Sequence, residues 1–126
     1  MEPNESENPE VAKIGLAFAR ALANGQFDIA YEMLAPSLRN KCQPKDLKSD
    51  YEQMTSYWDA PADHVEFKSV GESFDDWPEK GEKDLGWAFV AIASHSESGA
   101  FLEAVNVRVV DVSGRRLIAE IVWGRP

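Results

Sequence analysis

The sequence predicts an α+β domain in which three N-terminal helices lie on one face of a four-stranded antiparallel sheet. Across residues 11–54, apolar side chains recur every three or four positions, which is typical of helices with one buried stripe. From His64 onward apolar and polar residues alternate, and β-branched and aromatic residues are frequent, which indicates strands. Helices followed by strands favour the α+β class.

Prolines and glycines divide the helical half. Pro9 suits the first position of a helix, where a missing backbone N–H costs nothing, and Gly25 suits the residue just beyond a helix end. Pro36 and Pro44 open later segments in the same way. Helices are predicted at residues 9–24, 27–35 and 44–57, with a further turn at 36–41. Residues 1–8 are polar and acidic, and we expect a disordered lead-in to one domain spanning residues 9–126.

Strands are predicted at residues 64–74, 85–95, 100–110 and 115–123. The charged loop between the first two, residues 74–85, contains Trp77. Because tryptophan is frequent at interaction hot spots, Trp77 is a candidate partner-binding residue. An equally good interpretation is that Trp77 folds back over the edge of the sheet.

The turns between the last three strands set the predicted register. We expect three-residue loops at 97–99 and 112–114, each with its glycine in the left-handed conformation. This register places Trp87, Phe89, Ala91, Ala93 and His95 beside Val109, Val107, Val105, Glu103 and Phe101 on the helix-covered face. It also pairs Val105, Val107 and Val109 of the third strand with Ile121, Ala119 and Leu117 of the fourth. The outer face then carries Ala88, Val90, Ile92, Ala104, Asn106, Arg108, Ile118, Glu120 and Val122.

Charge and composition exclude several classes of partner. The 126-residue chain has 22 acidic and 13 basic residues and a formal net charge of −9. Nucleic acids and anionic membranes require a basic surface, so neither is an expected partner, whereas a basic protein is. The first residues do not resemble a secretory leader, no apolar run is long enough to span a membrane, and we expect a cytoplasmic protein.

No metal or cofactor is expected. His64 and His95 are too few for a histidine-built metal site, and the acidic residues of the 74–85 loop lack the spacing of a calcium loop. Cys42 is the single cysteine, so no internal disulfide can form. The neighbouring Lys41 could activate the thiol, but an inert, half-buried thiol is the better prediction.

The helical segment resembles a known superfamily. The similarity rests on the third helix, with the form LxxxYxxM, and on Phe18, Ala21, Leu22, Gly25, Gln26, Phe27, Ala30, Leu34 and Leu38. These features resemble the nuclear-transport-factor-two-like superfamily, which includes ketosteroid isomerases and polyketide cyclases. The resemblance implies a cone-shaped domain whose helices pack in the concave face of a curved sheet. It implies a conical cavity but not one particular activity, because the superfamily includes enzymes, transport factors and accessory domains.

Glu103 marks the predicted ligand site. In the predicted register Glu103 points into the cone, level with Ala93 and Trp123, and His95 lies diagonally from it. A carboxylate on an apolar face is costly unless it is paired or hydrated, which indicates a polar mouth. The candidate ligand-binding residues are Tyr31, Tyr51, Trp87, His95, Glu103 and Trp123. The alternative is a structural Glu103–His95 ion pair, or a Glu103 that reaches solvent.

Three functions follow as hypotheses. The first is a non-catalytic binding domain, for a small apolar ligand or a basic protein, because no catalytic signature is present. The second is a small isomerase or dehydratase that uses the same cavity. The third is a structural dimer module. The half-apolar outer face also predicts a homodimer through that face.

Overall fold

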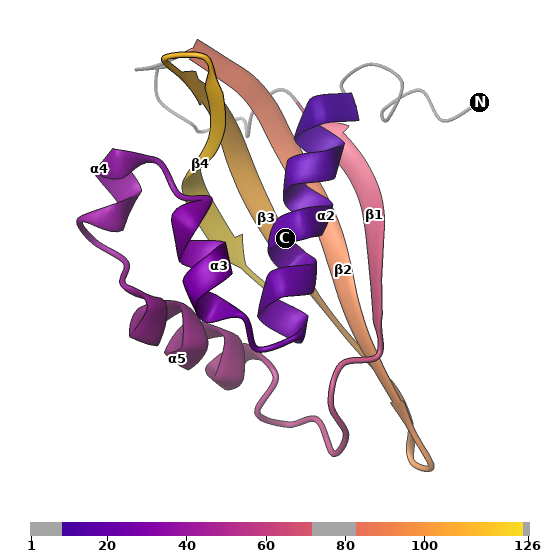
Figure 1. Ribbon diagram of the computed structural model, residues 1–126. Coiled ribbons are helices and arrows are strands. Elements are labelled where there is room, and N and C mark those ends of the chain that lie inside the picture. The colour runs from indigo at the N-terminus through magenta and orange to yellow at the C-terminus, as the bar shows by residue number, and fades with distance from the viewer. Residues whose placement is uncertain (1–8, 72–82, 125–126) are drawn as a thin grey trace.

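The computed structural model describes residues 9–71 and 83–124. Its helices are α2 (Pro9–Ala23), α3 (Phe27–Glu32), α4 (Pro36–Arg39) and α5 (Pro44–Met54). Its strands are β1 (His64–Gly71), β2 (Lys83–Ser96), β3 (Gly99–Val112) and β4 (Arg115–Trp123), and they form one antiparallel sheet in the order β1-β2-β3-β4. Figure 1 shows α2 lying across the sheet with the shorter helices beside it. The prediction of an α+β fold with a four-stranded antiparallel sheet is confirmed.

The helix boundaries follow from local chemistry. Gly25 has a φ of 74°, a left-handed value that glycine adopts without strain, and it directly follows the last turn of α2. At the start of α5, the Asp46 carboxylate accepts a hydrogen bond of 2.9 Å from the Gln43 backbone N–H. Both α4 and α5 begin with a proline, as predicted. The third predicted helix ends earlier than expected, at Met54.

The core lies between the helices and one face of the sheet. Fully buried side chains from the helical half meet fully buried side chains from the strands, among them Phe18, Leu22, Leu34, Leu47, Val90, Ile92, Val105 and Val107. Burying each large apolar side chain contributes about 1.5–3 kcal/mol to stability. Helix α2 lies close to the sheet at Gly15, where an added Cβ would lie 2.5 Å from the Cβ of Ala88. Glycine at this position lets the α2 backbone pack directly on β2.

The predicted register of β2 against β3 is wrong by one residue. The connection is a two-residue turn, with Ser96 opposite Gly99, and Ile92 rather than Ala93 lies beside Glu103. Because successive side chains of a strand point to opposite faces, this shift turns every β2 side chain over. Ala88, Val90 and Ile92 therefore face the helices, whereas the prediction placed them outside.

The turn between β3 and β4 also has two residues rather than three. Ser113 and Gly114 both have positive φ, of 53° and 87°, and Val112 pairs with Arg115. A two-residue turn alone would set Val107 opposite Glu120. The register shift beyond Val109, where Ala119 is left unpaired, instead sets Val107 opposite Ile121. This register shift is a β-bulge at Ala119, and it keeps apolar side chains paired on the buried face.

The outer face of the sheet accordingly differs from the predicted one. Ala88, Val90, Ile92 and Ile118 belong to the core, so they are not available to an outer surface. By strand alternation the outer face carries Trp87, Phe89, Ala91, Ala93, Leu102, Ala104, Asn106, Arg108, Glu120 and Val122. Trp87 and Asn106 are fully buried there, whereas Leu102 is 43% exposed.

Two predictions lie outside the described residues, namely the disordered lead-in at 1–8 and the role of Trp77. Of the predicted 74–85 loop, residues 83–85 belong to β2. In the described ranges, no helix is long and apolar enough to cross a membrane.

Candidate functional site

A pocket of about 400 Å³ opens between α5 and the ends of β3 and β4. It is lined by Asp50, Gln53, Met54, Glu103, Trp123 and Gly124. We call it the α5 pocket. Its size suits a small organic molecule, since ligand pockets commonly measure a few hundred cubic ångströms.

Helix α5 contributes one wall through its 3.6-residue period. Asp50, Gln53 and Met54 are three and four positions apart, so their side chains lie on one face of the helix. Tyr51 projects from a different face, where its ring centroid lies 6.2 Å from that of Phe27. Burial raises the pKa of the Tyr51 hydroxyl. Tyr51 therefore belongs to the helical core and not to the lining of the α5 pocket.

The opposite wall comes from the sheet. Trp123 lies opposite Val105, and Glu103 is two residues from Val105 on the same face of β3, so Trp123 and Glu103 are diagonal neighbours. Glu103 is half-buried, and its Oε2 accepts a hydrogen bond of 2.6 Å from the Tyr57 hydroxyl. The same hydroxyl lies 3.3 Å from the Leu102 carbonyl oxygen. The Glu103 carboxylate is thus held in place by the segment that follows α5.

The end of β4 is held by a buried amide. Asn106 is fully buried, and its Nδ2 donates to the carbonyl oxygens of Val122 and Gly124, at 3.2 and 3.0 Å. The Gly124 N–H donates to the Ala104 carbonyl oxygen at 2.8 Å. Gly124 has a φ of 94°, and a Cβ there would lie 4.0 Å from Glu103 Oε1. Asn106 therefore positions Trp123 and Gly124, the β4 side of the α5 pocket.

The structure brings together two of the six predicted ligand-binding residues, Glu103 and Trp123. Trp87 is buried on the other face of the sheet. Tyr31 packs under Arg39, whose Cζ lies 5.3 Å from the ring centroid, and it does not line the α5 pocket. The prediction that Glu103 lies level with the small Ala93 is wrong, since the fully buried Ile92 occupies that place.

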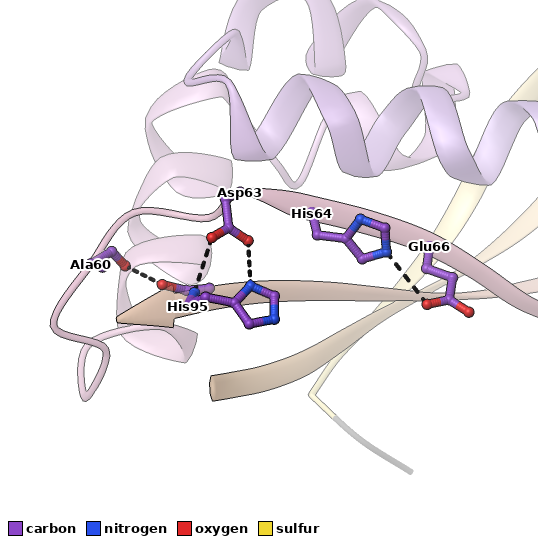
Figure 2. A network of polar contacts seen from close by, with 6 residues as sticks. Ala60, Asp63, His64, Glu66 and His95 are labelled. Carbon is purple, nitrogen blue, oxygen red and sulfur yellow. Dashed lines mark hydrogen bonds and ion pairs between the residues drawn. The ribbon is translucent and has the colours of Figure 1, made fainter. Parts of the chain in front are cut away.

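His95 lies away from the α5 pocket. Figure 2 shows its ring beside the carboxylate of Asp63, with His95 Nδ1 2.8 Å from Asp63 Oδ1. The His95 backbone N–H also donates to Asp63 Oδ2, at 3.1 Å. The hydrogen bond from the His95 side chain lowers the pKa of Asp63. His95 is exposed and paired with Asp63, which rules out the structural Glu103–His95 ion pair.

The segment before β1 is fastened to the β2–β3 hairpin by further polar contacts. Ser94 Oγ donates to the Ala60 carbonyl oxygen at 2.8 Å, and the Ser98 hydroxyl donates to the Asp59 carboxylate. Hydrogen bonds from the side chains of Ser98 and Ser96 lower the pKa of Asp59. The contacts join the end of the helical half to the hairpin and so support Tyr57, which holds Glu103.

A second pocket, of about 300 Å³, lies between the end of α2 and the start of β1. Among the described residues, its lining includes Arg20, Asn24, Asp63 and His64 but no phenylalanine, tyrosine or tryptophan. Both oxygens of Asp63 already accept from His95. The α5 pocket is the stronger candidate site, because Trp123 lines it.

Cys42 is a buried free thiol. The side chain is buried, and desolvation, followed by the charges of Asp50 and Asp46, raises its pKa to about 11. A thiol with so high a pKa is protonated at neutral pH and is a poor nucleophile. The burial and the raised pKa both favour the inert thiol that the sequence predicts, although the side chain is buried rather than half-buried. Within residues 9–71 and 83–124, no group of histidine, cysteine and carboxylate side chains is arranged to hold a metal ion.

Comparison with known proteins adds no assignment, since no family model matches the chain and no curated protein is similar to it. The α5 pocket includes four residues that sequence reasoning missed: Asp50, Gln53, Met54 and Gly124. The signal for the first three is their spacing on one face of the predicted third helix. Tyr57 was also missed as the partner of Glu103.

Proposed function

We propose that this protein is a non-catalytic binding domain whose α5 pocket holds a small ligand with an apolar part. The observation that carries the proposal is the pairing of an aromatic side chain, Trp123, with an anchored carboxylate, Glu103, at the mouth of one pocket. An aromatic wall supplies apolar contact, and a few fixed polar groups orient a ligand. The helices on one face of a four-stranded sheet support the cone-shaped arrangement of the nuclear-transport-factor-two-like superfamily.

A fragment screen by NMR tests the proposal. Fragments that bind in the α5 pocket should shift the Trp123 indole N–H and the Gly124 amide N–H. A Gln53→Trp substitution fills the pocket and should abolish those shifts. Ser49→Trp is the matched control, because Ser49 is exposed on α5 and does not line the pocket. A screen in which no fragment moves either resonance would contradict the proposal.

A second candidate function is an isomerase or dehydratase that uses the same pocket. The observation that favours it is the 2.6 Å contact of the Tyr57 hydroxyl with Glu103 Oε2, since a tyrosine and a carboxylate can act as an acid and a base. The test is incorporation of solvent deuterium into bound carbonyl fragments. If the domain is an enzyme, Glu103→Gln should abolish exchange and leave fragment binding in place. Absence of exchange in the unmodified protein would exclude this chemistry for those fragments.

We also propose a homodimer through the outer face of the sheet. The residues of that face are the ones given above for the observed sheet, from Trp87 to Val122. Apolar side chains there include Leu102, which is 43% exposed. Leu102→Lys should therefore convert the dimer to a monomer in light scattering behind a sizing column, because a charge would be buried at the interface. Ile29→Lys is the matched control, since Ile29 on α3 is 52% exposed. An unmodified protein that runs as a monomer at tens of micromolar, a rough working range for a modest interface, would refute the dimer.

A further inference from the structure

We infer that residues 55–63 form a strap that sets the position of Glu103 in the α5 pocket, and that Tyr57 and Ser94 are positioning residues for this pocket. The inference rests on the proposed function, because it concerns the same pocket and names what orders its carboxylate. The strap runs from the end of α5 to the start of β1. All of its residues are described, and none of them lines the pocket. Its effect on a ligand therefore passes through Glu103.

Two serines of the β2–β3 hairpin hold the middle of the strap. Ser94 is fully buried, and its hydroxyl donates to the Ala60 carbonyl oxygen at 2.8 Å. A buried hydroxyl without a partner costs free energy, so the contact with Ala60 is what favours a serine at this position. Nearer the turn, the Ser98 hydroxyl donates to the Asp59 carboxylate. Both contacts join the strap to the hairpin whose second strand carries Glu103.

The end of the strap is held at Asp63. Its backbone N–H donates to the Ala93 carbonyl oxygen at 2.9 Å, and its carboxylate lies against His95 (Figure 2). The hydrogen bond from the His95 side chain lowers the pKa of Asp63, which means that the contact favours the charged carboxylate. The strap is thus fixed at its middle and at its end by the same hairpin.

Three aromatic rings hold the beginning of the strap. The rings of Tyr57 and Trp58 lie 5.7 and 6.4 Å from the ring of Phe101 on β3, and 6.3 Å from each other. The Tyr57 and Phe101 rings meet edge to face, at 75°, a geometry that aromatic pairs favour. Because Tyr57 is 53% exposed, these neighbours and the backbone of the strap fix its ring, not the core. Its hydroxyl is thereby aimed at Glu103 Oε2, 2.6 Å away.

The contacts form one chain from the hairpin to the pocket. Ser94 fixes the strap at Ala60. The strap fixes the ring of Tyr57, whose hydroxyl fixes the Glu103 carboxylate. A carboxylate that is already held in one rotamer loses little conformational freedom when a ligand binds, which lowers the cost of binding. Release of the strap should therefore disorder Glu103 and weaken any ligand that donates a hydrogen bond to it.

Tyr57→Phe and Ser94→Ala test the chain of contacts. NMR scalar couplings should show one rotamer of Glu103 in the free, unmodified protein and more than one in each variant. Benzyl alcohol is the probe, with a hydroxyl for Glu103 and a ring for Trp123. Each variant should bind it about threefold to tenfold more weakly, as loss of one hydrogen bond would produce. Because Ser94 acts through Tyr57, adding Ser94→Ala to Tyr57→Phe should weaken binding by less than about twofold more.

Two further variants separate this effect from a general loss of stability. Val110→Ala removes fully buried apolar atoms at the other end of β3, so it should lower the melting temperature and leave the Glu103 rotamer unchanged. Ser98→Asp places a like charge beside Asp59 at an exposed position and should release the strap as Ser94→Ala does. Ser37→Asp is its control, because Ser37 is exposed on α4.

The outcomes distinguish the strap from the function beneath it. A single Glu103 rotamer in both Tyr57→Phe and Ser94→Ala would overturn the strap. Fully additive losses of benzyl alcohol affinity in the double variant would refute the positioning role of Ser94. If the rotamers change as expected but neither benzyl alcohol nor any fragment of the screen binds the unmodified protein, the proposed function fails and the strap stands.

Discussion

Replacing Asn106 by aspartate should destabilise the fold by about 3–5 kcal/mol at pH 7, because it leaves a buried charge without a compensating partner. Asn106 is fully buried, and its Nδ2 donates to two backbone carbonyl oxygens, those of Val122 and Gly124. The introduced carboxylate has the same shape but no N–H donor. It would point its charge at the two carbonyl oxygens, so both lost hydrogen bonds and repulsion contribute.

The loss of unfolding free energy in the Asn106→Asp variant should depend on pH. Burial and the facing carbonyl oxygens raise the pKa of the introduced carboxyl in the folded state above the value of about 3.9 expected in the unfolded chain. The folded state then binds more protons than the unfolded state between those two pKa values, so the variant loses stability relative to the unmodified protein as pH rises through that window. Near pH 4 the carboxyl is protonated and can donate to one carbonyl oxygen, and part of the stability returns.

Urea unfolding at pH 4, 5.5 and 7 measures this effect, and the unmodified protein at each pH is the reference. Asn40→Asp is the matched control, since Asn40 is exposed at the end of α4. Its cost should remain within about 0.5 kcal/mol at every pH. A deficit for Asn106→Asp that is equally small, or that does not change with pH, would show that the amide does not hold the end of β4 as described. The Trp123 and Gly124 NMR signals should also broaden or move in this variant, because they lie on the strand end that Asn106 holds.

Replacing Gly15 by alanine should destabilise the fold by about 1–3 kcal/mol through overpacking, although alanine is the better helix former. On an open helix surface the same change would stabilise the protein by about 1 kcal/mol. The sign is reversed at Gly15 because the added Cβ would lie 2.5 Å from Ala88 Cβ and 3.2 Å from Val90 Cγ2. Carbon atoms do not approach to 2.5 Å without a shift of the helix or the strand.

A double-mutant cycle isolates that contact. Ala88→Gly removes the methyl group that the new side chain would meet, so the double variant should be more stable than the sum of the two single effects predicts. Ala17→Gly is a control for helix propensity alone, because Ala17 is exposed on the same helix. Thermal or urea unfolding of the set provides the free energies. A Gly15→Ala protein that is more stable than the unmodified one would mean that α2 does not pack on Ala88.

The elements of this fold could be predicted because their signals are local. Proline at positions 9, 36 and 44 and glycine at 25 act on the backbone of their own neighbourhood, and α2, α4 and α5 begin at those prolines. Strand β4 was predicted with the observed bounds, Arg115–Trp123, since alternation and turn residues delimit it. The side of β3 that faces the helices was also predicted, because Val105 and Val107 are the apolar members of an alternation with Asn106 and Arg108.

Strand β2 shows where local signals fail. Both of its faces are apolar: Ala88, Val90 and Ile92 alternate with Trp87, Phe89 and Ala91. A pattern that is apolar on both faces does not specify which face is buried. A one-residue change in turn length exchanges the buried face and the outer face. The packing of α2 decides it, because Gly15 lies directly against the small side chain of Ala88, where little room is left. Trp87 and His95 were misplaced together for this one reason.

By itself, then, the amino-acid order determined where the helices and strands lie, that their class is α+β, and that Glu103 and Trp123 share the helix-covered face of the sheet. Only the tertiary structure decided the two-residue turns, the unpaired Ala119 and the face on which Trp87 and His95 lie. It also decided that Asp50 and Glu103 line the same pocket. The physical reason is the range of the interactions. Turns and helix ends are set by neighbouring residues, whereas register and pocket lining depend on contacts between segments far apart in the chain, each of which must fit the others at once.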